Sequence, residues 1–73
     1  MVDGNKIIKY TKVYVYDEWE DDWIEAIFLS YDKTRREKRF LVQYYYYYED
    51  EENSLHAINE RFNYCSLKKK EDV

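Results

Sequence analysis

This chain has few of the residues that staple or interrupt a small domain. Among its 73 residues there is no proline, one glycine, one cysteine and one histidine. A lone cysteine excludes a disulfide within the chain, and Cys65 with His56 supplies at most half of a zinc site, so the sequence predicts no metal. An unpaired cysteine favours a reducing compartment, the cytosol or the nucleus.

Long apolar segments and catalytic groupings are missing as well. No apolar run approaches the roughly 20 residues of a membrane span, and the first residues lack the apolar segment of a signal peptide. His56 has no serine nucleophile at a recognisable turn, and the carboxylate clusters lack the glycine of a calcium loop. The sequence therefore predicts a non-enzymatic domain with no cofactor and no membrane partner.

Charge is plentiful and unevenly distributed. The net charge is −4, from 16 acidic and 12 basic residues. Acid is concentrated at 17–22 and 49–52, next to the aromatic residues Trp19, Trp23 and Tyr44 to Tyr48, and base at 33–39 and 68–70. Acidic loops beside aromatic rings favour a cationic peptide over a phosphate backbone. The alternative is that these are solvated loops that keep a small domain soluble.

The order of patterns predicts one domain. Residues 1–5 are expected to be a flexible start, 6–67 the domain, and 68–73 a charged tail or linker. Residues 13–16 alternate valine and tyrosine and predict a strand, followed by a turn at 17–22. Residues 23–31 are ambiguous, because Trp19, Trp23 and Ile27 also recur at helical spacing, but a strand is favoured.

The second half predicts more short strands. A hairpin loop at 32–38 leads into a strand at 40–48, and a short strand at 55–58 follows. Asn59 is a competent N-cap for one or two helical turns through Phe62 and Tyr64. We therefore predict an all-β fold, a small, strongly bent barrel of four or five antiparallel strands with a short C-terminal helical turn. Its core is expected to contain Trp23, Ile27, Phe40, Val42 and Ile58.

The tyrosine run Tyr44 to Tyr48 is the most concentrated recognition surface in the chain. Tyrosine favours extended backbone, and its electron-rich ring attracts cations. The tyrosines are either ligand-facing or simply barrel filler and solvent-facing strand formers. Trp23 is interpreted as a core anchor, whereas Trp19, between two glutamates, is the better binding candidate.

Two motifs resemble the Royal superfamily, the Tudor, chromo barrel and Agenet group of chromatin-associated barrels. The stretch WIEAIFLS at 23–30 resembles the W-x-x-A-x-V-L-S second strand of these domains, and RFLVQY at 39–44 resembles their k-[FY]-x-V-H-Y third strand. Between them lies a basic hairpin. The resemblance covers residues 13–67 and is strongest to the chromo barrel, or Tudor-knot, that precedes the catalytic domain of MYST-type histone acetyltransferases.

The resemblance implies a methyl-lysine cage. By position, Tyr16 or Trp19 would supply the first-loop wall, and Tyr44 and Tyr47 the walls at the end of the third strand. The strand would then have to end or bulge near Tyr45 and Tyr46 to bring Tyr44 and Tyr47 onto one rim. This chain departs from the family at Ile24, where cage-forming members usually carry Tyr, and at Ala57, where chromo barrels carry Trp.

The function that the resemblance implies is a nuclear, chromatin-associated reader within a larger multidomain protein. It would bind methylated lysine or arginine on a basic histone-like peptide. Two alternatives stay open: a scaffold without a cage, and an RNA- or DNA-binding domain. The nucleic-acid patch would consist of hairpin residues Lys33, Arg35, Arg36, Lys38 and Arg39.

Overall fold

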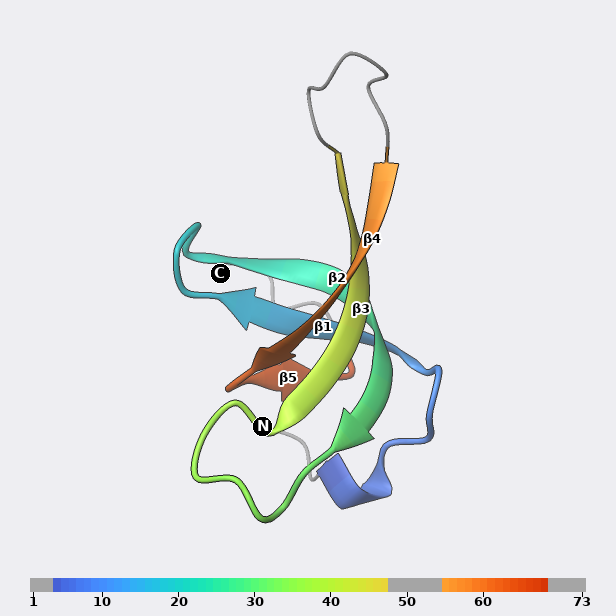
Figure 1. Cartoon of the computed structure of the whole chain (residues 1–73), viewed down its shortest axis with the longest axis vertical. Helices are drawn as coiled ribbons and strands as arrows, with labels where there is room; N and C mark the ends of the chain where they lie inside the picture. Colours follow the sequence, from blue (N-terminus) through green and yellow to red (C-terminus); the bar gives the residue numbers. More distant parts are fainter. Residues whose placement is uncertain (1–3, 48–54, 69–73) are drawn as a thin grey trace.

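Five antiparallel strands form one sheet in the computed structural model, which describes residues 4–47 and 55–68. The strands lie in the order β4-β3-β2-β1-β5, which places the last strand beside the first. The sheet is strongly curled (Figure 1). This confirms the predicted all-β class and the number of strands. The strand bounds are β1 Lys12–Asp17, β2 Asp22–Tyr31, β3 Phe40–Tyr47, β4 Leu55–Phe62 and β5 Cys65–Ser66.

The first hairpin settles the ambiguous segment as a strand. β1 pairs with β2 in unbroken register, with Lys12 opposite Ile27 and Asp17 opposite Asp22. The Asp17 carboxylate closes the turn, because its Oδ1 accepts hydrogen bonds from the backbone N–H groups of Trp19 (2.9 Å) and Glu20 (3.4 Å). Asx turns of this kind are a local signal, which is why the sequence revealed the turn at 17–22.

β2 and β3 form the second hairpin, around the basic loop at 32–39. Their register shifts by one residue between Phe28 and Ser30, a β-bulge in β2. A bulge bends its strand and increases the local twist. Both strands curve strongly in Figure 1, and the side chain of Ala26 is only 3% exposed on this bent strand. The bulge thus lies in β2, whereas the sequence placed one near Tyr45 and Tyr46 in β3.

The predicted C-terminal helical turn is wrong. Residues from Asn59 to Phe62 belong to β4, which pairs with β3 residue for residue from Phe40 opposite Phe62 to Tyr47 opposite Leu55. A helix of one or two turns is marginal in water, and the open edge of β3 offers this segment a complete set of backbone partners. The described residues contain no α-helix; a 3-10 turn, η1, spans Gly4–Lys6.

A sharp corner after β4 closes the fold. β5 pairs with β1, Val15 opposite Cys65, and Tyr16 N–H donates to the Tyr64 carbonyl at 3.3 Å. The end of the described chain is therefore returned to the first strand. This corner lies beside the β1–β2 turn, two segments that are about 45 residues apart along the chain.

Apolar side chains from all five strands fill the interior. Phe40 and Val42 lie in the core as predicted, but Trp23, Ile27 and Ile58 are only partly buried. β2 has apolar residues on both faces. Its pairing with β1 turns the face of Ala26 and Phe28 inward and leaves Trp23 and Ile27 on the other face. The buried core consists of Val13, Val15, Ala26, Phe28, Phe40, Val42, Phe62 and Cys65.

Candidate functional site

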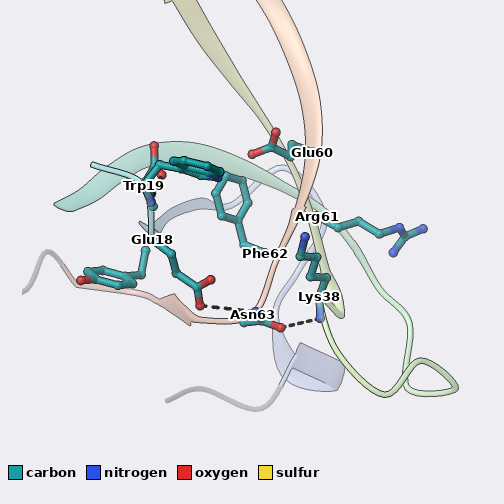
Figure 2. A pocket seen from close by; sticks show the side chains of 9 residues that line it. Glu18, Trp19, Lys38, Glu60, Arg61, Phe62 and Asn63 are labelled. Atoms are coloured by element: carbon teal, nitrogen blue, oxygen red, sulfur yellow. Dashed lines mark hydrogen bonds between the residues drawn. The ribbon is translucent and has the colours of Figure 1, made fainter. Parts of the chain in front are cut away.

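A cavity of about 350 Å³ lies between the β1–β2 turn and the corner that follows β4 (Figure 2). Residues from both segments line it, together with one residue from the end of the basic loop. They are Tyr16, Asp17, Glu18, Trp19, Lys38, Glu60, Arg61, Phe62 and Asn63. We call it the acidic cavity, because its carboxylates outnumber its cations.

Three aromatic residues line the acidic cavity. Trp19 is 97% exposed in the β1–β2 turn, whereas Trp23 is partly buried. Figure 2 shows its indole beside the ring of Phe62, which is largely buried at the end of β4. The ring of Tyr16 packs against the rings of Trp23 and Tyr64, at centroid distances of 5.5 and 6.4 Å. The cavity therefore joins one freely accessible ring to two fixed ones.

Carboxylates dominate the polar part of the lining. Glu18 and Glu60 come from the two opposite segments, whereas the Asp17 carboxylate is already engaged in the turn. Figure 2 shows Arg61 extending away from the other lining residues. The groups left beside the rings are mainly Glu18, Glu60 and Lys38, so the local field favours a cation.

Asn63 holds the segments around the cavity together. Its Oδ1 accepts a hydrogen bond from the backbone N–H of Lys38 at 2.7 Å, and its Nδ2 donates to Glu18 Oε1 at 3.5 Å (Figure 2). Lys38 has φ of 53°, in the left-handed region that disfavours a residue with a Cβ. One amide thus connects the corner, the basic loop and the β1–β2 turn.

The predicted cage residues are only partly brought together. Tyr16 and Trp19 both line the acidic cavity, but Tyr44 is not part of its lining and packs edge-on against Phe62, at a centroid distance of 6.0 Å. The predicted end or bulge of the strand near Tyr45 and Tyr46 is wrong, because β3 continues to Tyr47 and its ladder with β4 is regular. The shift meant to place Tyr44 and Tyr47 on one rim is therefore absent, and the Tyr47 side chain lies outside what is described.

Sequence reasoning missed Phe62, Glu18, Glu60 and Asn63. The sequence predicts a helical turn for the segment that contains Phe62 and Glu60. A helical turn there does not predict that either residue lies near Trp19. Asn63 follows directly after a strand, a common place for a side chain that connects loops, but its partners lie far away in sequence. The second acidic segment, at 49–52, lies outside the described residues.

The basic residues predicted as a nucleic-acid patch do lie together, in the loop between β2 and β3. Lys33, Arg35, Arg36 and Lys38 are exposed, and Arg39 is half-buried. Arg39 Nη1 donates to the Tyr31 hydroxyl at 3.3 Å. Asp32 caps the opposite end of this loop. Its carboxylate accepts hydrogen bonds from the Thr34 hydroxyl at 2.5 Å and from the Thr34 N–H at 3.0 Å, and these two bonds lower the pKa of Asp32.

Groups for other chemistry are sparse in the described part of the chain. Residues 4–47 and 55–68 contain no group of three or more His, Cys, Asp or Glu side chains placed to hold a metal ion. Burial raises the pKa of the Cys65 thiol to about 11, the reverse of nucleophile activation. No helix among the described residues is long and apolar enough to cross a membrane.

Comparisons with protein-family models, with curated proteins and with solved structures find no significant match to this chain. The resemblance to the Royal superfamily thus rests on the two sequence motifs.

Proposed function

We propose that this domain is a reader that binds a methylated lysine or arginine of a basic, histone-like peptide in the acidic cavity. The observation that carries the proposal is the convergence of Trp19, Phe62 and Tyr16 with the carboxylates of Glu18 and Glu60. In this site Phe62 takes the place that the family resemblance implies for Tyr44 and Tyr47.

The chemistry of the lining matches a methylated cation. Methyl groups make an ammonium ion bulkier and less strongly hydrated, so contact with aromatic faces becomes more favourable than with water. A cation over an aromatic face gains about 0.5–1 kcal/mol when exposed and about 2 kcal/mol when desolvated. Because Trp19 is almost fully exposed, we expect the lower value there and a modest affinity overall.

The surroundings favour a basic peptide as the carrier. Five of the six residues at 17–22 are acidic, and Glu60 lies across the cavity. Acidic rims accelerate the association of cationic ligands, and the effect weakens as salt screens it. The motif resemblance to chromo barrels supports the same function, and with it a nuclear, non-catalytic module of a larger chromatin-associated protein.

An NMR titration tests the proposal. Histone-like peptides carrying unmodified lysine, trimethyl-lysine or dimethyl-arginine are added to the labelled domain. We expect a methylated peptide to bind more tightly than its unmodified form and to shift the resonances of Trp19 and Phe62. The shifts should shrink at high salt.

Matched variants separate this site from the tyrosine run. Trp19→Ala should weaken the methylated peptide by about 1 kcal/mol, in line with a single exposed cation–π contact. Tyr45→Ala, a change at another exposed ring 61% accessible on β3, should leave binding unchanged. Equal affinity for methylated and unmodified peptides would reject the site and favour the scaffold interpretation. Loss only in Tyr45→Ala would move the site to the tyrosine run.

A further inference from the structure

A second cavity, of about 300 Å³, lies on the basic loop side of Asn63. It is lined by three cations and one acid, together with aromatic and amide groups. The lining residues are Tyr31, Arg36, Glu37, Lys38, Arg39, Phe40, Asn63 and Tyr64. We call it the basic cavity. Lys38 and Asn63 line both cavities, so the two are neighbours of opposite charge.

The cations of the basic cavity are held by a structured loop. Asp32 N–H donates to the Arg39 carbonyl at 3.0 Å across the loop ends, and the Lys38 backbone is fixed by Asn63. The Arg39 guanidinium donates through Nε to the Arg35 carbonyl and through Nη1 to the Tyr31 hydroxyl. A site whose loop is already ordered loses less conformational entropy when a ligand binds.

The donors in this cavity suit a compact anion. Arginine presents a planar set of N–H donors that fits phosphate oxygens, lysine adds a point charge, and the hydroxyl of Tyr31 can rotate to donate. A phosphate monoester carries a charge of about −1.5 to −2 at neutral pH and three acceptor oxygens. Three cations against the single carboxylate of Glu37 match that charge.

We propose that the basic cavity binds the phosphate of a phosphorylated serine or threonine in the same peptide whose methylated side chain enters the acidic cavity. This inference rests on the proposed function for the identity of the peptide, whereas the phosphate site is argued from the lining of the basic cavity alone. One extended peptide, advancing about 3.3 Å per residue, then places a cation and an anion in adjacent cavities of opposite charge.

The charge distribution favours a phosphopeptide over a nucleic acid. The basic cavity is bordered through Lys38 and Asn63 by Glu18 and Glu60 of the acidic cavity. A polyanion continuing past a single phosphate would meet those carboxylates and a domain of net charge −4. A single phosphate beside a basic segment meets no such barrier.

Four peptides of one histone-like sequence test the proposal: unmodified, methylated on the lysine, phosphorylated, and doubly modified. Phosphoserine is placed in turn at each of the three positions on either side of the lysine. For at least one spacing we expect phosphorylation to tighten binding about fivefold, the equivalent of one or two exposed ion pairs, at low salt. A methylation effect without any phosphorylation effect overturns this inference and leaves the proposed function intact. A phosphorylation effect alone supports the basic cavity and rejects the methyl-ligand site.

Arg36→Gln should abolish the gain from phosphorylation and leave the gain from methylation unchanged. Lys33→Gln is the matched control, because Lys33 is exposed in the same loop but does not line the cavity. Equal losses in the two variants would mean diffuse attraction and overturn the site. Tighter binding of a short RNA than of any phosphopeptide, lost in both variants, would assign the loop to nucleic acid instead.

Discussion

Replacing Asn63 should loosen both cavities while leaving the core intact. Asn63→Ala removes the acceptor for the Lys38 N–H at 2.7 Å and the donor to Glu18 at 3.5 Å. An intramolecular hydrogen bond contributes about 0.5–1.5 kcal/mol, and the second of these is at the limit of bonding distance. Loss of the hydrogen bond also lets Lys38 leave its disfavoured positive φ, which offsets part of the cost. The expected loss in the free energy of unfolding is therefore about 1 kcal/mol. For a domain of this size that lowers the melting midpoint by about 4–8 °C.

Urea unfolding followed by tryptophan fluorescence measures this loss. Asn59→Ala is the matched control, since Asn59 is exposed on β4 and should change the free energy of unfolding by less than about 0.5 kcal/mol. Asn63→Ala should also weaken both the methylated and the phosphorylated peptide. If the two variants are equally stable, Asn63 does not hold the three segments together and the description of the site is wrong.

Asn63→Asp separates the two hydrogen bonds. It keeps an acceptor for Lys38 but places a second carboxylate next to Glu18, so repulsion between like charges raises the pKa of the introduced carboxyl group. A raised carboxyl pKa in the folded state adds stability at low pH and removes it as pH rises. Relative to the parent protein, the variant should therefore be less stable at about pH 7 and recover part of the difference below about pH 4. A difference that does not change with pH would contradict this.

Two further predictions concern the core. Val42→Ala should lower the free energy of unfolding by about 2–3 kcal/mol, the transfer of two methyl groups plus a cavity, whereas Leu55→Ala at a 62% exposed site should cost less than about 0.5 kcal/mol in the same urea assay. Equal costs would place the core elsewhere. The Cys65 thiol, with its pKa raised from 9.0 to about 11, stabilises the fold only while protonated, so stability is lost as pH rises through this window. The stability advantage over Cys65→Ala should therefore narrow between about pH 8 and about pH 11, and a constant advantage would mean that the thiol titrates normally.

The hairpins were predictable from sequence because their signals are local. The alternation from Val13 to Tyr16, the Asp17 turn and the polar loop after Tyr31 each lie within a few residues. The face of β2 that turns inward was not predictable, because Trp23 and Ile27 on one face are as apolar as Ile24 and Phe28 on the other. Only pairing with β1, which places Ala26 opposite the buried Val13, decides between them.

The candidate site was less predictable than the hairpins, because its parts meet only through the topology. Trp19 was identified from its acidic neighbours, a local signal. Phe62 and Glu60 reach it because β4 continues as a strand to the corner, and that depends on its pairing with β3. A short helix there, as the Asn59 cap suggested, would have left the acidic cavity without its second wall.

The position of the tyrosine run changes how it should be interpreted. Figure 1 shows the paired ends of β3 and β4 as an arm that extends beyond the other strands. Tyr45 and Tyr46 are 61% and 52% exposed on this arm, and the buried core is built mainly from valine and phenylalanine. An arm that gains little from burial must be stabilised by its own cross-strand pairs, and aromatic residues are among the best strand formers for that purpose. Tyr44 to Tyr47 are therefore sufficiently explained as strand formers, and the candidate binding groups are Trp19 and Phe62, where rings and carboxylates converge.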